Sequence, residues 1–207
     1  MTAPPYPVSL SVEGRDCLVV GGGRIGARKA TELARCGAIV QVVASSVAPE
    51  LRAEPAVQID ERPYRADDVR GRWLVVAATD DRALNRAVAA DAEAAGVWVN
   101  AVDDPEVCSF TAPALLRQGP VVVAVSTGGR SPALAGWLRD RLAGLVGPEM
   151  GVAAELLAEA RATLRAKGQS TAGFDWRLVL DSDMLELVRE GKTERARERL
   201  AQCLSSS

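Results

Sequence analysis

"CLVVGGGRIGARKATELARCG", residues 17–37, places an apolar run, a group of glycines and a helix-like pattern one after another. The first four residues are typical of a short buried strand. Gly21, Gly23 and Gly26 then follow in the order G-x-G-x-x-G. Glycine at these positions permits a tight turn, lets backbone N–H groups approach a pyrophosphate, and allows a helix to pack closely on the strand.

The residues after the glycines favour a helix. Gly26, Ala30, Leu33 and Gly37 recur at i, i+4, i+7 and i+11, which is one face of a helix. The glycines therefore lie before a helix N-terminus, which is a natural anion site. This order of strand, glycine turn and helix predicts dinucleotide binding, although glycine-rich turns also serve packing alone.

Composition narrows the function classes. The chain has 207 residues, of which 48% are hydrophobic and 25% charged, so it can bury one core with an appendage or two small cores. Its net charge of −2 gives no sign of a nucleic-acid partner or of a cationic membrane surface. The opening "MTAPPYPVSL" lacks the pattern of a signal peptide, and no apolar run spans a bilayer, so we expect a cytoplasmic protein.

The sequence contains no histidine, which excludes Ser-His-Asp triads, His-based zinc sites and the commonest general base. Proton transfer must therefore use Asp, Glu, Lys, Tyr, Cys or water. The cysteines at positions 17, 36, 108 and 203 form no C-x-x-C pair, so we expect neither a zinc site nor a disulfide framework. Small buried side chains are the simplest interpretation. Cys108 alone is kept as a candidate for a redox or metal role.

Strand and helix patterns alternate up to about residue 100. Further strands are predicted at residues 38–44, 56–64, 73–79 and 96–102, with a helix over 81–95. Alternation of this kind predicts a doubly wound, mostly parallel α/β sheet. Ligands of such sheets bind beyond the carboxyl ends of the strands, where the sequence has "GGGRIG", "ASS", "ATDD" and "NAVDDPE". We expect either Asp80 or Asp81 to cap the following helix.

One departure from the usual dinucleotide pattern concerns the ribose. The second strand ends in Ala44-Ser45-Ser46, without an Asp or Glu to accept hydrogen bonds from the adenosine ribose. Either Ser45 and Ser46 or backbone groups take this role. The choice between NAD and NADP stays open, because no clear arginine clamp for a 2′-phosphate is present either.

The pattern changes after residue 105. Two strands joined at "RQGP" precede a glycine loop and a helix that begins at Ser131-Pro132, a hydroxyl N-cap followed by proline. From residue 148 on, the pattern is helical and carries no chemical motif. We therefore divide the chain into residues 1–112, 113–147 and 148–207.

Three spaced segments, in order, resemble a known family: "DCLVVGGGRIGARKATEL", "AATDD" and "VNAVDDPEVCSFTAPALLRQGPVVVAVSTGGRSPALA". They look like the precorrin-2 dehydrogenase/sirohydrochlorin ferrochelatase module of siroheme synthase, over about residues 6–145. The resemblance implies an NAD-binding Rossmann domain, a strand-containing dimerisation region and a small all-helical C-terminal domain, assembled as an interlocked homodimer.

The resemblance also implies an activity. The family oxidises precorrin-2, a tetrapyrrole, to sirohydrochlorin with NAD⁺ as hydride acceptor, then inserts Fe²⁺ to give siroheme. One aspartate of an N-x-V-D motif, here Asp103, is implicated in both steps. A carboxylate beside the ring can accept the protons released by oxidation and by metal insertion. If the Asp103 carboxylate is partly buried without a partner, we expect its pKa to be raised, which suits this role. The alternative for both aspartates is a turn at Asp-Asp-Pro, and this is the interpretation we favour for Asp104.

The resemblance implies further site residues by position. The cofactor would contact Gly21, Gly23, Arg24, Ile25, Ser45, Ser46, Thr79 and Asp80. The tetrapyrrole would contact Asn100, Ser126, Thr127, Gly128, Arg130 and Ser131. Arg117, Arg130 and Arg139 are either partners of the substrate carboxylates or solvated surface residues. Some family members have a phosphorylatable serine where this chain has Thr127.

Alternatives remain at this point. Some relatives perform the dehydrogenation alone, and Co²⁺ is an alternative to Fe²⁺. A non-catalytic NAD-binding regulatory module and a dehydrogenase of a small metabolite are the rival classes. Larger members continue into a methyltransferase domain that this sequence lacks, so we expect methylation from another protein. Relatives often have alanine at position 26, a change expected to leave binding unaffected.

Overall fold

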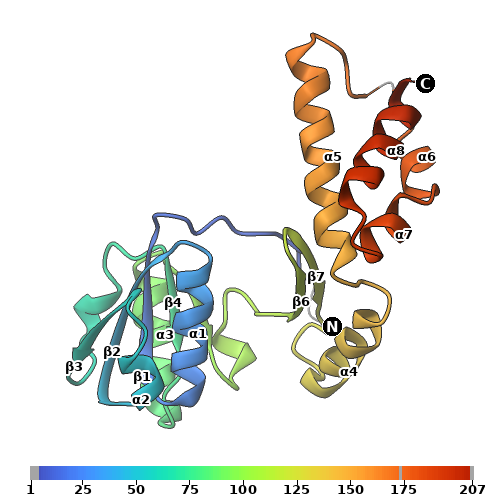
Figure 1. Ribbon diagram of the computed structural model, residues 1–207. Coiled ribbons are helices and arrows are strands. Elements are labelled where there is room, and N and C mark those ends of the chain that lie inside the picture. Colours follow the sequence, from blue (N-terminus) through green and yellow to red (C-terminus); the bar gives the residue numbers. More distant parts are fainter. Residues whose placement is uncertain (1–4, 173, 206–207) are drawn as a thin grey trace. The chain divides into compact units, whose positions relative to one another are not determined.

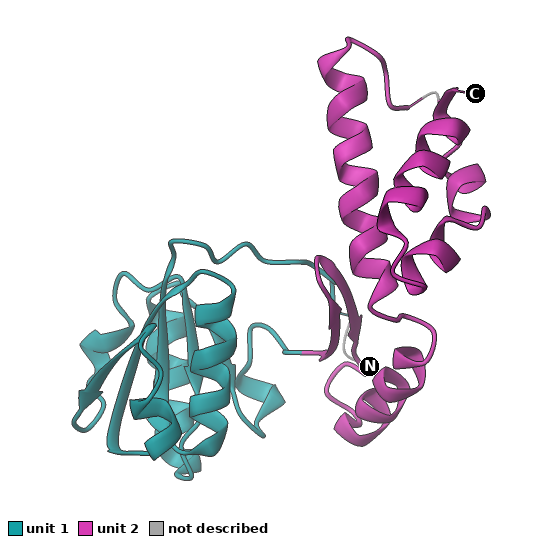
Figure 2. Ribbon diagram, in the orientation of Figure 1, with its two compact units in different colours: residues 1–112 teal, residues 113–207 magenta. Residues whose placement is uncertain are grey.

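The computed structural model describes residues 5–172 and 174–205. The chain forms two compact units, residues 1–112 and residues 113–207 (Figure 2). The three-part division made from the sequence stays a prediction. In the described part of the chain, no helix is long and apolar enough to cross a membrane.

The first unit is built on a parallel sheet of five strands, as the alternating pattern predicts. The strands are β1 (Asp16–Gly22), β2 (Ile39–Val47), β3 (Val57–Glu61), β4 (Leu74–Ala77) and β5 (Trp98–Ala101). Their order in the sheet is β3-β2-β1-β4-β5. The strand order reverses between β1 and β4, which are hydrogen-bonded neighbours. A crevice for a ligand is expected beyond the carboxyl ends of two such strands.

Helices cover both faces of this sheet (Figure 1). One face packs against α1 (Arg24–Arg35) and the short α2 (Pro49–Arg52). The other packs against α3 (Arg82–Ala94) and the 3₁₀ helix η1 (Ala66–Val69). The mixed α/β fold class predicted from the sequence is confirmed.

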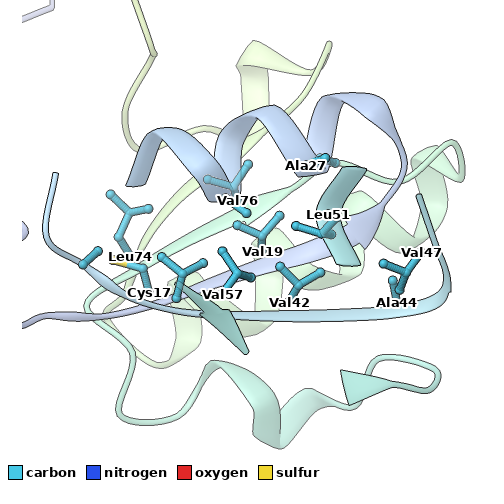
Figure 3. Close-up of a cluster of buried hydrophobic side chains, with 14 of the residues drawn as sticks. Cys17, Val19, Ala27, Val42, Ala44, Val47, Leu51, Val57, Leu74 and Val76 are labelled. Carbon is cyan, nitrogen blue, oxygen red and sulfur yellow. The ribbon is translucent and has the colours of Figure 1, made fainter. Parts of the chain in front are cut away.

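Residues 17–20 of β1 point alternately to opposite faces of the sheet, and all four are buried. Cys17 and Val19 belong to the cluster beneath α1, where Val19 lies near Ala27 and Leu51 (Figure 3). Leu18 and Val20 belong to the cluster beneath α3. Burial on both faces explains why this strand is a continuous apolar run rather than an alternating one.

The glycine turn after β1 is tightly packed. Gly21 has φ of 119°, and a Cβ there would overlap the Ala78 carbonyl oxygen. A Cβ at Gly26 would overlap the carbonyl oxygen of Gly21. Alanine at position 26 therefore requires this backbone to shift, while its expected lack of effect on binding stays a prediction.

The end of α1 also differs from the sequence pattern. The helix ends at Arg35, and Gly37 lies beyond it with φ of 81°. Gly37 N donates to Ala34 O (2.9 Å) and Ala38 N to Leu33 O (3.2 Å). These two bonds form a Schellman motif, in which glycine is favoured because its φ is positive. Gly37 thus terminates the helix instead of lying on its apolar face.

Strand β3 ends three residues earlier than predicted. Arg62 leaves the sheet and places both terminal guanidinium nitrogens on the two Asp68 carboxylate oxygens, at 2.7 and 2.8 Å. Asp68 also accepts from the backbone N–H of Arg65. This ion pair closes the turn into η1.

The described residues of the second unit form a hairpin and five helices. They are β6 (Ala114–Gln118), β7 (Val121–Val125), α4 (Pro132–Ala143), α5 (Glu149–Ala166), α6 (Trp176–Leu180), α7 (Met184–Arg189) and α8 (Thr193–Ser205). The two strands pair antiparallel around a Gly119-Pro120 turn. A buried cluster that includes Leu156, Met184 and Leu200 holds α5 to α8 together.

The predicted start of α4 is confirmed. The Ser131 hydroxyl accepts from Leu134 N (3.2 Å), and Pro132 is the first helical residue. The following helix, α5, begins against the hairpin turn, where a Cβ at Gly151 would lie 2.7 Å from Gln118 O. The side-chain amide of Gln118 donates to Val146 O (3.2 Å). The turn, the loop before α5 and the helix start are thereby fixed together.

Candidate functional site

The N-terminus of α1 is open. Gly23 is its N-cap, and no described side chain accepts from the first-turn N–H groups. A Cβ at Gly23 would meet no described atom within 4 Å, in contrast to Gly21 and Gly26. The first turn carries the exposed residues Arg24 and Ile25 and no acidic side chain. The turn therefore fits an anionic group brought close to the backbone, such as a pyrophosphate.

The two serines predicted near a ribose lie beside this turn. Gly22 is in register with Val47, and Ala48 N donates to Gly22 O (2.8 Å). A Cβ at Gly22 would overlap Ser46 O. Ser45 and Ser46 are exposed. The end of β2 and the glycine turn thus form one continuous surface.

The loop after β4 is held by a residue that the sequence reasoning missed. Asn85 of α3 is 4% exposed. Its Oδ1 accepts from Thr79 N (3.1 Å), and its Nδ2 donates to Thr79 O (2.9 Å). The Thr79 hydroxyl lies 2.7 Å from the same Oδ1. The one sequence signal for this role is that Asn85 is the single amide side chain in an alanine-rich helical segment.

Of the two aspartates that follow, Asp81 caps α3. Its Oδ1 accepts from Ala83 N (2.8 Å) and Leu84 N (3.1 Å). Asp80 is exposed and lies between this cap and Thr79. The structure therefore gives the capping role to Asp81 and leaves the Asp80 carboxylate available at the sheet edge.

Asp103 lies on a turn directly after β5. Its φ is 59°, and among the described residues no other non-glycine residue has a positive φ. Asp tolerates this left-handed conformation better than most residues. The preceding residue, Val102, donates its N–H to Ala77 O (2.9 Å), which joins the turn to the end of β4. The Asp103 side chain is exposed, so the condition of partial burial is not met.

Asp104 differs from Asp103 in both the burial and the hydrogen bonding of its side chain. It is 2% exposed, and its carboxylate accepts from Arg86 Nε (2.6 Å), Arg86 Nη2 (3.2 Å) and Arg82 Nε (3.1 Å). Hydrogen bonds from Arg86 and then Arg82 hold the pKa of this carboxyl well below its usual range. Asp104 is thus a buried carboxylate paired with two largely exposed arginines rather than only a turn residue, and sequence reasoning did not identify either arginine.

Cys108 joins the two ends of the turn that contains Asp103 through contacts with the backbone of Ala101 and Asp104. Its Sγ accepts from Ala101 N (3.2 Å) and lies 3.2 Å from Ala101 O and 3.3 Å from Asp104 O. Burial raises the pKa of this thiol, which disfavours the reactive thiolate. Within residues 5–172 and 174–205, no group of three His, Cys, Asp or Glu side chains could hold a metal ion. These contacts favour a structural role for Cys108.

Asn100, predicted to contact the substrate, uses its amide inside the loop. Its Nδ2 donates to Phe110 O (3.0 Å) and lies 3.6 Å from Cys108 Sγ. A hollow of about 430 Å³ borders the same loop and is lined by Trp98 and Val107. Neither Asp103 nor the glycine turn lines it. The candidate site is therefore the strand-end surface and not this hollow.

The remaining predicted substrate residues form a loop of the second unit. Gly128 and Gly129 both have positive φ, at 62° and 77°. The Thr127 hydroxyl accepts from Ser131 N (3.0 Å) and donates to Ser131 O (3.1 Å), and Ser126 Oγ accepts from Gly128 N (3.2 Å). These hydroxyl groups shape the loop itself.

The arginines predicted to bind carboxylates have different surroundings. Arg130 is exposed in the loop between β7 and α4. Arg139 pairs with the neighbouring Asp140 at 2.6 Å. Arg117 is exposed on β6. The roles of these three residues stay predictions.

Comparisons with known proteins match both parts of the chain. A model of a putative NAD(P)-binding family matches residues 8–114, and a model of the central domain of a sirohaem biosynthesis protein matches residues 118–145. Siroheme synthase of Nitrosomonas eutropha is 39% identical over 98% of this chain and 44% of the relative. Siroheme synthase of Methylococcus capsulatus is 39% identical over 92% of this chain and 41% of the relative.

This chain thus spans less than half the length of these curated relatives. A solved structure, SirC, precorrin-2 dehydrogenase, superposes with a TM-score of 0.72 over 97% of this chain and 100% of that one. Its sequence identity of 24% makes it evidence for the fold alone.

The Asp104 ion pair predicts a pH-dependent stability. Its folded pKa lies below the unfolded value of about 3.9, so its stabilising contribution is complete above that value and is lost as the pH falls toward the folded pKa. Urea unfolding of the wild type and Asp104→Asn should differ by a constant free energy from pH 7 to about 5, and the difference should narrow below about 4.

The control for this measurement is Asp67→Asn, which removes an exposed pair with Arg70. Such pairs contribute little to stability, so this variant should follow the wild type at every pH. A difference between wild type and Asp104→Asn that stays constant down to pH 3 would contradict the ion-pair account.

Proposed function

This chain belongs to the precorrin-2 dehydrogenase/sirohydrochlorin ferrochelatase family, and we propose that it oxidises precorrin-2 to sirohydrochlorin with NAD⁺ as the hydride acceptor. The observation that carries the proposal is the placement of Asp103. Its turn is bonded to the end of β4 through Val102 N and Ala77 O, and Ala78, the residue directly after β4, lies against the glycine turn at Gly21. A carboxylate and an open anion site thus share one edge of the sheet.

The residues at the glycine turn fit the cofactor. In this proposal Gly21, Gly23, Arg24 and Ile25 lie along the pyrophosphate, and Ser45 and Ser46 contact the adenosine ribose. Thr79 and Asp80 border the crevice. When bound, the nicotinamide supplies the acceptor for the hydride that leaves the macrocycle. The end of β2 holds neither an acidic residue for the ribose hydroxyls nor an arginine for a 2′-phosphate, so it favours neither cofactor. We propose NAD⁺ because the resembling family uses it.

Asp103 supplies the acid–base chemistry in this proposal. Oxidation of precorrin-2 removes one hydride and one proton, and the Asp103 carboxylate accepts the proton. The absence of histidine makes a carboxylate the natural base. Asp104 does not compete for this role, because its carboxylate oxygens are already bonded to two arginines.

The proposal extends to metal insertion. Sirohydrochlorin would take up Fe²⁺ with the release of two pyrrole N–H protons, which Asp103 would accept in turn. Co²⁺ is the alternative metal, and dehydrogenation without chelation is the alternative activity. Asn100, Ser126, Thr127, Gly128, Arg130 and Ser131 are the proposed contacts of the tetrapyrrole. The expected cytoplasmic location is a further part of the proposal.

The rival proposal is a non-catalytic NAD-binding regulatory module. It requires the glycine turn but gives no reason for a left-handed aspartate at the end of β5. It would predict cofactor binding without any interaction with a tetrapyrrole. The two proposals therefore separate on the behaviour of Asp103.

The first test is an anaerobic assay with precorrin-2 and NAD⁺, following NADH and the macrocycle spectrum, then adding Fe²⁺ or Co²⁺. Asp103→Asn should slow NADH formation by about 10²- to 10⁴-fold, because the base is lost. Asn also tolerates positive φ, so the fold should be kept. Glu106→Gln, at an exposed carboxylate three residues away, should retain the wild-type rate.

Equal rates for the wild type and Asp103→Asn would contradict the assigned base. No NADH from the wild type with NAD⁺ or NADP⁺ would contradict the dehydrogenase proposal and favour the regulatory module. A spectral change that requires Fe²⁺ or Co²⁺ would establish chelation and its metal, and none with either would leave dehydrogenation alone.

The glycine turn offers a matched pair of variants for cofactor binding. Gly23→Ala adds a methyl group where no described atom lies within 4 Å, at φ of −75°, so no steric clash is expected. Because Gly23 is the N-cap of α1, where alanine is less favourable than glycine, stability should fall by about 0.5–1 kcal/mol. The same methyl group would occupy the space of the pyrophosphate, so NAD⁺ affinity should fall about tenfold or more. Calorimetric titration and urea unfolding measure the two quantities.

Gly26→Ala should lower stability more than Gly23→Ala does. Its Cβ overlaps the Gly21 carbonyl oxygen, and overpacking of this kind costs about 1–3 kcal/mol. Wild-type NAD⁺ affinity in Gly23→Ala would contradict the proposed cofactor position, whatever the stability of the two variants.

A homodimer is also part of the proposal, supported by the surface of the second unit. Val122, Leu134, Trp137 and Leu145 are between 46% and 73% exposed, on β7, on α4 and just after α4. Large exposed apolar groups of this kind are typical of protein–protein contacts. The rest of that strand and helix is also largely apolar.

Light scattering of the purified chain should therefore give twice the mass of 21.8 kDa. Trp137→Glu should shift the mass toward the monomer, because a charge would be buried in the contact. Leu178→Glu, at a comparably exposed leucine of α6, is the control and should stay dimeric. A monomeric wild type at micromolar concentration would contradict this part of the proposal.

A further inference from the structure

We propose that Asp104 is a positioning residue, which holds Asp103 in its left-handed conformation at the sheet edge through the ion pairs that its buried carboxylate forms with Arg82 and Arg86. The proposal rests on the proposed function in one respect, the role of Asp103 as base. Asp104 itself need not touch the substrate. Its effect is to fix the backbone position from which the neighbouring carboxylate projects.

The conformation of Asp103 needs support from its surroundings. A left-handed residue is less stable than one in the right-handed region, although the difference is smaller for Asp than for most residues. The turn's own hydrogen bond, from Asp104 N to Ala101 O, is long at 3.4 Å. Conformations of this kind persist where neighbouring contacts determine them. The contacts on each side of Asp103 must therefore provide the constraint.

On the N-terminal side, the constraint is the sheet. Ala101 is in register with Ala77 in the β4–β5 ladder. Val102 N donates to Ala77 O (2.9 Å), which extends the hydrogen bonding by one residue. The chain therefore reaches Asp103 in a fixed direction.

On the C-terminal side, the constraint is the Asp104 carboxylate. It accepts from Arg86 Nε, Arg86 Nη2 and Arg82 Nε at 2.6–3.2 Å. The two arginines are four residues apart and so share one face of α3. That helix is fixed to the sheet through the buried residues Val88 and Ala92. The ion pair thus ties the turn to a rigid element and not to another loop.

The backbone of Asp104 is held as well. Its carbonyl oxygen accepts from Val107 N (3.3 Å) and lies 3.3 Å from Cys108 Sγ, which also contacts both backbone polar atoms of Ala101. The residues on each side of the Val102–Asp103 pair are therefore joined by one sulfur atom. Asp103 has little freedom left except in its side chain.

The test is the effect of Asp104→Asn on the anaerobic NADH assay. We expect kcat to fall about 10- to 100-fold, as misplacement of a catalytic group by about 1 Å does. The KM values for precorrin-2 and NAD⁺ should stay within about twofold, because the proposed binding groups lie elsewhere. Asp104→Glu keeps a carboxylate for Arg86 and should recover part of the kcat.

Glu106→Gln is the matched control. Glu106 also contacts Arg86 Nη2 (3.4 Å), but its carboxylate is 81% exposed. Removing its charge should leave kcat unchanged. Arg82→Gln removes a single bond to Asp104 and is the second variant should Asp104→Asn fold poorly, with a smaller fall in kcat expected.

A double-mutant cycle separates positioning from general stability. In the Asp103→Asn background, Asp104→Asn should lower the residual rate no further, because no carboxylate is left to position. Additive losses, a wild-type kcat in Asp104→Asn, or a loss confined to KM would each overturn the proposal.

One readout is independent of the reaction. Amide hydrogen exchange at residues 101–108 should be faster in Asp104→Asn than in the wild type and unchanged in Glu106→Gln. If the wild type fails to oxidise precorrin-2 but this difference is present, the proposed function is wrong while the constraint on the turn is supported. Unchanged exchange in Asp104→Asn overturns the constraint itself.

Discussion

The close approach of the Gly21 backbone to the Ala78 carbonyl is the constraint on which the candidate site depends. Only a glycine at position 21 allows this contact, both because its φ is positive and because a Cβ would overlap the carbonyl oxygen. The ends of β1 and β4 therefore touch. The bond from Val102 N to Ala77 O continues the same edge to β5. An open helix N-terminus at Gly23 and the carboxylate of Asp103 follow from one parallel sheet, whose strands all end on one side.

Two adjacent aspartates at the end of β5 have different surroundings. Asp104 is buried and ionised between Arg82 and Arg86, which removes it from acid–base chemistry. Asp103 is exposed and conformationally fixed. In the proposed function, such a pair gives a chain without histidine a base whose backbone position is defined by the fold. Cys108, which the sequence left open as a redox or metal candidate, instead supports this arrangement by its contacts with the loop backbone.

The parts that could be predicted from the sequence are those with local signals. The apolar runs, the G-x-G-x-x-G order and the hydroxyl before Pro132 each specify structure within a few residues, and the structure agrees with them. The clamp of Asn85 on Thr79 and the Asp104 ion pair have no such signal, because which polar side chains meet depends on how α3 packs on the sheet. The exposure of Asp103 and the tight contact at Gly26 likewise depend on the exact path of the backbone, which residue pattern does not give.

The most direct test of the account is a crystal structure of this chain with NAD⁺ and sirohydrochlorin bound. The account predicts the pyrophosphate at Gly23 against the first-turn N–H groups of α1, with the macrocycle beside a left-handed Asp103. It also predicts Asp104 still bonded to Arg82 and Arg86. A dinucleotide bound away from the glycine turn, or a macrocycle out of reach of Asp103, would contradict it.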